Sequence, residues 1–243
     1  MTLLNTVIKF YFNHVYNPVY DKTTAQLTSY QFLQAQCVHS LAVSEHSHIL
    51  CVGLGTGNEL YHLKNAADDI RITGIDYSKN AIKKAAVKGS ELGIPVDLHI
   101  MDAGRLSFRD ELFDAVYCVH VMDFVPDISL VTGEIVRVLK TGGRFVITYP
   151  SKMETLGLGT QILRGNNESN QVRAPEKRPA TVKAVKMMAI LIIGLLYLPL
   201  LFRPQKKQMS RDDVAGIFEN CRISDYTITE ISSYGDFIVS GEK

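Results

Sequence analysis

The stretch CVGLGTGN, residues 51–58, decides the fold class of this 243-residue chain. Glycines at positions 53, 55 and 57 let the backbone turn tightly and let a ligand approach it without obstruction by Cβ atoms. The apolar run at residues 48–53 predicts a buried strand, and residues 58–65 predict a helix. Open α/β sheets bind their ligands at such strand-to-helix turns, at the carboxyl ends of the strands.

The spacing of these glycines separates several kinds of nucleotide-binding loop. The dinucleotide pattern GxGxxG needs a glycine where this chain has Asn58, and the phosphate-binding P-loop needs a Gly-Lys-Ser/Thr ending that is absent. Glu59 follows in the first turn of the predicted helix, and its negative charge disfavours a diphosphate there. The loop therefore disfavours a nicotinamide dehydrogenase.

Outward from this loop, short apolar runs alternate with helical stretches. Strands are predicted at residues 71–76, 96–101, 113–119 and 144–149, and helices at 80–92 and 129–139. Gly93 predicts a helix stop, and Gly142 with Gly143 predicts a turn into the last of these strands. This alternation implies right-handed crossovers and a parallel sheet that is covered on both faces.

The two ends of the chain add helices and closing strands. Helices are predicted at residues 3–16 and 24–43, and Ser210 with Asp213 predicts a capping box that starts a helix reaching residue 220. Residues 222–230 and 236–240 predict an antiparallel pair at the sheet edge.

We therefore expect an α/β, Rossmann-like, seven-stranded and mostly parallel sheet with an antiparallel edge strand. It forms one domain of four parts: an N-terminal helical cap (1–47), a cofactor-binding core (48–150), an insertion or lid (151–209), and a C-terminal helix with edge strands (210–243).

Composition excludes some classes of protein. Hydrophobic residues make up 46% and charged residues 21%, which excludes wholesale disorder, and the net charge of +1 provides no global attraction for nucleic acid. The four cysteines form no CxxC pair and lie in apolar stretches, so we expect buried free thiols in a reducing, cytoplasmic compartment. The N-terminus lacks the charged region and cleavage site of a secretory signal.

A second apolar segment, MMAILIIGLLYLPLLF at residues 187–202, interrupts the alternation. As a helix it would span about 24 Å, and crossing a bilayer usually takes about 20 residues. Crossing would also separate residues 210–243 from the sheet that they complete. Three interpretations stay open: a lid over an apolar substrate pocket, an interfacial helix whose basic flanks within residues 183–207 contact a membrane, or a helix buried against the N-terminal pair.

Asp76 ends the predicted strand 71–76, nineteen residues after Gly57. A carboxylate there can accept hydrogen bonds from both hydroxyls of a ribose. The alternative is a turn or cap residue, because Ser78 follows. The glycine loop favours ribose binding.

Five ordered segments, ILCVGLGTGNEL (49–60), ITGIDYS (72–78), IMDAGRLSF (100–108), FDAVYCVHVMDFVPD (113–127) and EIVRVLKTGGRFVIT (134–148), carry a family resemblance. The chain resembles the class I S-adenosylmethionine-dependent methyltransferases. The nearest branch is the small-molecule type that includes the ubiquinone and menaquinone C-methyltransferases. The resemblance covers residues 48–150 in order, and residues 210–243 more loosely.

The resemblance implies S-adenosylmethionine as cofactor and roles for particular residues. Gly53, Gly55 and Gly57 would line its methionine and ribose parts, and Asp76 would hold the ribose hydroxyls. The other implied contacts are Tyr77 beside the adenine, Asp102 at the adenine amino group, Ala103 at the ring edge, and Val119 with His120 near the methionine end and the transferable methyl.

The chain departs from the family at two positions. The family often has an acidic residue where Cys51 stands, and this position usually organises the loop around the methionine amino group. A His-containing pair commonly follows the fourth strand, where this chain has Asp123 and Phe124.

Methyl transfer needs chiefly an in-line approach of the acceptor, and some acceptors must also lose a proton. The candidate bases are His120, Asp123 and His14, each of which also has a structural interpretation. Three tyrosines could orient a substrate or the cofactor's carboxylate, or simply pack in the core: Tyr16, Tyr20 and Tyr30.

No cluster has metal-ligand spacing, so we expect no metal. The leading hypothesis is a methyltransferase that modifies oxygen, nitrogen or carbon of a small or lipid-like apolar acceptor. The alternative is a protein that binds S-adenosylmethionine without transferring methyl, as a cyclisation catalyst, a regulator or a partner-binding subunit.

Overall fold

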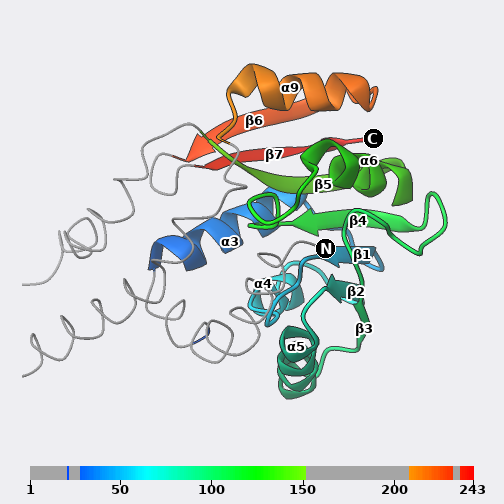
Figure 1. The fold of residues 1–243 in the computed structure, drawn as a ribbon. Helices are drawn as coiled ribbons and strands as arrows, with labels where there is room; N and C mark the ends of the chain where they lie inside the picture. Colours follow the sequence, from blue (N-terminus) through cyan, green and yellow to red (C-terminus); the bar gives the residue numbers. More distant parts are fainter. Residues whose placement is uncertain (1–20, 22–27, 152–207, 232–235) are drawn as a thin grey trace, which may run out of the picture.

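The computed structural model describes residues 21, 28–151, 208–231 and 236–243 (Figure 1). The predicted helix at 3–16 and the apolar run at 187–202 lie outside these residues, as does almost all of the predicted lid. In the part of the chain that is described, no helix is both long and apolar enough to cross a membrane.

Within the described residues, seven strands form one sheet in the order β3-β2-β1-β4-β5-β7-β6. Strands β1 to β5 run parallel, and β7 runs antiparallel to both β5 and β6. The predicted fold class is confirmed, with one refinement: the antiparallel strand lies one position in from the edge. The bounds are β1 His48–Val52, β2 Arg71–Asp76, β3 Val96–Ile100, β4 Phe113–Cys118, β5 Leu139–Pro150, β6 Asp225–Ile231 and β7 Asp236–Glu242.

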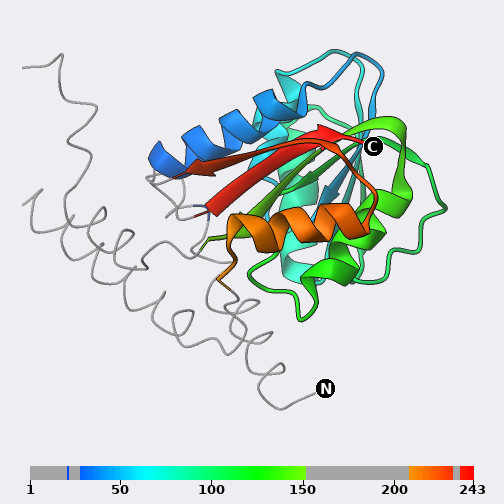
Figure 2. The same ribbon diagram turned by 90° about the horizontal axis from the view of Figure 1, so that it is seen from above.

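Helices cover both faces of the sheet (Figures 1 and 2). One face carries α3 (Thr28–Leu41), α4 (Glu59–Lys64) and α5 (Lys79–Leu92), and the other carries α6 (Ile128–Val138) and α9 (Arg211–Asn220). The strand order reverses between β1 and β4, where successive crossovers leave in opposite directions. Ligands of open α/β sheets bind in the crevice at the carboxyl ends of the strands at this point.

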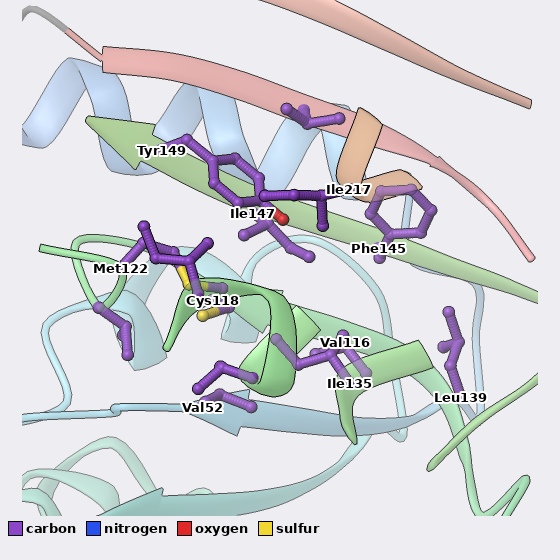
Figure 3. Close-up of a cluster of buried hydrophobic side chains, with 14 of the residues drawn as sticks. Val52, Val116, Cys118, Met122, Ile135, Leu139, Phe145, Ile147, Tyr149 and Ile217 are labelled. Atoms are coloured by element: carbon purple, nitrogen blue, oxygen red, sulfur yellow. The ribbon is translucent and has the colours of Figure 1, made fainter. Parts of the chain in front are cut away.

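The alternating side chains of β1 explain why both faces need a cover. Ile49 and Cys51 join the core cluster beneath α3, α4 and α5, whereas Leu50 and Val52 join the cluster beneath α6 and α9. Figure 3 shows the second cluster, in which Val52, Val116 and Ile147 meet Ile135 and Ile217. A strand buried on both faces has the continuous apolar sequence that predicted it.

Local end signals confirm several predicted boundaries. The Ser78 hydroxyl accepts from the Ala81 N–H at the start of α5, and Gly93 ends that helix in the left-handed region with φ of 67°. Ser210 and Asp213 form the predicted reciprocal capping box of α9.

Two predictions need correction. Gly142 and Gly143 do not form a turn before the fifth strand; they lie within β5, which already pairs with β4 at Leu139. The β4–β5 register shifts between Leu139 and Arg144, so the glycines form a bulge. The second correction concerns the thiols, because Cys221 is only partly buried, unlike the other three cysteines.

Candidate functional site

The glycine loop follows β1 at the reversal point of the sheet. Gly53, Gly55 and Gly57 have φ angles of 65°, 56° and 77°, a region that side chains other than glycine rarely adopt. A Cβ on Gly53 would lie 2.3 Å from Cγ2 of Val121, and a Cβ on Gly57 would lie 2.9 Å from Cδ1 of Leu60. The loop therefore requires glycine for its conformation and, at two positions, for its close packing.

Asp76 holds this loop from the end of β2. Its Oδ2 accepts from the Gly55 N–H at 2.9 Å, and its Oδ1 accepts from the Ser78 N–H at 2.8 Å. Burial raises the pKa of Asp76, and these two N–H groups partly oppose that rise. Because a carboxylate offers about four acceptor positions, two remain for the hydroxyls of a ligand. The turn-forming role and the expected ribose role are therefore compatible.

The residues expected around an adenine lie after β2 and β3. Tyr77 is 39% exposed. Ile100, the last residue of β3, was not among the predicted contacts but is 57% exposed, so both residues offer apolar surface to a flat ring. Asp102 is exposed and accepts from the Gly104 N–H at 2.8 Å, and Ala103 packs partly against the core. With the buried Asp76 carboxylate, this set fits an adenosyl group.

Asp21, a residue that the sequence did not single out, contacts the glycine loop. The Thr56 hydroxyl donates to Asp21 at 2.5 Å, and Asp21 lies 3.5 Å from Nζ of Lys88. The Lys88 ammonium also donates to Oδ1 of Asn58 at 2.5 Å. A hollow of about 230 Å³ adjoins these groups, and its lining includes Asp21, Tyr30 and Asn58. The predicted site residues His14, Tyr16 and Tyr20 lie outside the described residues.

Glu59, the first residue of α4, is buried although it is charged by type. Its carboxyl is electrostatically coupled to the Cys51 thiol, to Asp76 and to Lys88. Burial raises the pKa of Glu59 to about 8, against the opposing effects of its own N–H and of Lys88. The sequence predicts this charge beside the loop but does not indicate its burial. Cys51 itself is fully buried beneath the loop.

His120 lies two residues beyond β4, next to Val119, which packs partly against the core. Its backbone is held at a φ of 57°, in the left-handed region, and its N–H donates to Oγ1 of Thr148 at 2.8 Å. The ring stacks on Tyr30 of α3, with centroids 5.6 Å apart and planes 17° apart. A non-glycine residue at positive φ must be held by its surroundings, and these contacts hold it.

Two carboxylates accompany the His120 ring. Nδ1 of His120 lies 3.1 Å from Oδ2 of Asp236, a buried residue at the start of β7. One ligand-type atom each of His120, Asp123 and Asp236 lies within 4.8 Å of the others. Burial lowers the pKa of His120, but the hydrogen bond to Asp236 and the charges of both carboxylates outweigh it, so the pKa is raised.

Asp236 was missed because it lies far from His120 along the chain and inside a predicted strand. Only the antiparallel pairing of Pro150 with Asp236 brings it to the end of β5. The expectation that no metal-ligand cluster exists rested on spacing along the chain, and spacing does not detect three groups that the fold assembles.

Residues 50–147 match a family model described as a methyltransferase domain. Among curated relatives, the chain is 39% identical to a phosphatidylethanolamine N-methyltransferase of Cereibacter sphaeroides, over 41% of this chain and 48% of that protein. It is 27% identical to the sterol 4-C-methyltransferase strm-1 of Caenorhabditis elegans, over 60% of this chain and 44% of that protein. The chain spans about half the length of these relatives.

Solved structures share the fold. A SAM-dependent methyltransferase from Aquifex aeolicus superimposes with a TM-score of 0.58 at 16% identity, covering 90% of this chain and 96% of that one. At this level of identity, the likeness supports the fold alone.

Proposed function

We propose that this chain, whose residues 50–147 match the methyltransferase-domain family model, uses S-adenosylmethionine to transfer a methyl group to a small or lipid-like apolar acceptor. One observation carries the proposal: the Asp76-held glycine loop and the His120–Asp236 pair lie at neighbouring strand ends of the same sheet.

Different residues of the site would bind the ribose, the adenine and the methionine of the cofactor. Asp76 has acceptor positions left for ribose hydroxyls, and the glycine loop admits a close approach. Tyr77 offers the adenine an exposed ring, while Asp102 and Ala103 offer it a carboxylate and a backbone edge. Cys51 supports the loop from the core, and Val119 would face the methionine end. Tyr20 is a further proposed contact, on the sequence alone.

His120 is the proposed proton acceptor. When bound, S-adenosylmethionine supplies a methyl group whose carbon–sulfur bond breaks with the electron pair left on sulfur, giving S-adenosylhomocysteine. In the neutral ring, Asp236 accepts from Nδ1–H of His120, and the lone pair is then on Nε2, which is buried. An acceptor hydroxyl or acidic C–H can give its proton to that nitrogen. Asp123 adds negative charge that stabilises the resulting imidazolium. His14 stays a candidate from the sequence alone.

The relatives and the apolar run support an apolar acceptor. The two curated relatives act, by their names, on a sterol and on a phospholipid. Residues 187–202 carry no charge and are flanked by cations within 183–207, a pattern that suits an anionic membrane surface. An apolar acceptor, reached at or near a membrane, fits both observations.

The experiment is a transfer assay. Purified protein with S-adenosylmethionine is incubated with sterol, quinone-precursor and phosphatidylethanolamine acceptors, with and without anionic phosphatidylglycerol liposomes. Formation of S-adenosylhomocysteine that depends on the acceptor supports transfer. Tight binding with no product supports the alternative, a domain that binds the cofactor without using it.

Two controls assign the residues. Asp76→Ala should weaken S-adenosylmethionine binding by roughly tenfold or more, since hydrogen bonds to a buried charge are lost; unchanged affinity would remove the ribose assignment. Asp236→Asn should preserve binding and lower turnover. A chelator control separates proton transfer to His120 from any metal held at His120, Asp123 and Asp236.

A further inference from the structure

Glu59 is a buried carboxyl group whose own N–H and the Lys88 charge only partly offset the cost of its burial. Glu59 is only 6% exposed and is the first residue of α4, directly after the loop that joins β1 to α4. Among the described residues it forms no ion pair within 4.0 Å, and Lys88 acts on it only at longer range. Buried carboxyls are costly unless a cation or several donors accompany them.

The groups around Glu59 do not supply a full counter-ion for its carboxylate. Asp76 of β2 raises the pKa of Glu59, Lys88 of α5 lowers it, and the Cys51 thiol of β1 is neutral because burial raises its own pKa well above its ordinary value. Lys88 already donates a hydrogen bond to Asn58 and forms an ion pair with Asp21. One more positive charge beneath the glycine loop would therefore be favourable.

We infer that Glu59 binds the α-ammonium group of the cofactor's methionine, a role for which the sequence offers no acid at Cys51. This inference rests on the proposed function, because it takes S-adenosylmethionine as the ligand of the loop. Glu59 lies one residue after the loop, and its carboxyl is coupled to Asp76, which the Gly55 N–H joins to the same loop. An ammonium there pairs with the carboxylate and gives it the missing counter-ion.

Charge pairing has a measurable consequence. With a pKa of about 8, most Glu59 carboxyls carry a proton at pH 7. An arriving ammonium favours the carboxylate, so the proton leaves Glu59 and passes to the buffer as the ligand binds. Calorimetric titration in phosphate and in Tris, buffers with different ionisation enthalpies, measures that proton.

The test compares S-adenosylmethionine with 5′-methylthioadenosine, which keeps the adenosine but has neither the ammonium nor the carboxylate. In the wild-type protein, S-adenosylmethionine should release most of one proton and 5′-methylthioadenosine none. Glu59→Gln should abolish the release and weaken S-adenosylmethionine roughly 10- to 100-fold, as expected for a charged hydrogen bond. It should leave 5′-methylthioadenosine unchanged, and Glu91→Gln, at an exposed glutamate of α5, should change nothing.

The outcomes separate the two proposals. If neither ligand binds the wild-type protein, the proposed function fails. If both bind but Glu59→Gln leaves affinity and proton release unchanged, the Glu59 assignment is wrong and the function stands. Should Glu59→Gln not fold, the wild-type comparison decides by itself: equal proton release with the two ligands overturns the inference.

Discussion

Gly53→Ala is the substitution whose effect the structure defines most sharply. Gly53 combines a φ of 65° with a hypothetical Cβ that would lie 2.3 Å from Cγ2 of Val121. Gly55 has nearly the same φ, 56°, but its Cβ would meet nothing closer than a carbonyl oxygen at 3.9 Å. The two positions therefore separate backbone strain from steric overlap.

The expected magnitudes follow from these two terms. A left-handed conformation costs an alanine about 1–2 kcal/mol, and the stiffer unfolded chain returns about 0.4–1 kcal/mol. Gly55→Ala should thus lower the free energy of unfolding by about 1 kcal/mol. Gly53→Ala adds an overpacking cost of about 1–3 kcal/mol, because Val121 is buried and its branched side chain has restricted rotamers.

Urea denaturation followed by circular dichroism measures these differences. The double variant Gly53→Ala with Val121→Ala removes Cγ2 and should recover the overpacking part, so the double-mutant cycle should show a coupling of about 1–3 kcal/mol. Equal losses for Gly53→Ala and Gly55→Ala, with no coupling to Val121, would refute the steric argument.

Three further predictions concern caps and charges. Ser210→Ala should lower the free energy of unfolding by about 1 kcal/mol through loss of the α9 cap. A thermal unfolding midpoint equal to that of the wild-type protein would contradict this. Arg137 lowers the pKa of Glu134 below its ordinary 4.5, so this pair stabilises the fold above that pH and loses its effect as pH falls through the depressed pKa. Glu134→Gln should therefore destabilise at pH 7, and its effect should shrink as the pH is lowered below 4.5; an effect that does not change with pH would argue against the pair. The pKa of His120, measured by NMR, should exceed its ordinary 6.5 and fall in Asp236→Asn; its contribution to stability is then complete below 6.5 and lost as pH rises through the raised pKa. An unchanged His120 titration in that variant would remove Asp236 from the site.

Local patterns account for most of what the sequence predicted correctly. The strand at residues 71–76 has the same bounds in the structure, and β1 ends within one residue of the prediction. Buried parallel strands have continuous apolar runs, and glycine or serine marks helix ends by its own conformation or hydrogen bond, so each signal lies within a few residues. The same locality explains the error at Gly142 and Gly143, where two glycines indicate a turn but register with β4 makes a bulge.

The sequence by itself determined the alternating α/β architecture, the glycine loop and the Asp76 carboxylate that follows the second strand. Only the tertiary structure decided which distant groups join them. Asp236 reaches His120 through the antiparallel pairing of β7 with β5, and Asp21 contacts Thr56 although the two lie 35 positions apart in the sequence. Glu59 becomes buried because α4 packs on the sheet. Hydrophobic periodicity acts over a few residues, whereas these contacts depend on strand order and register, which are properties of the assembled sheet.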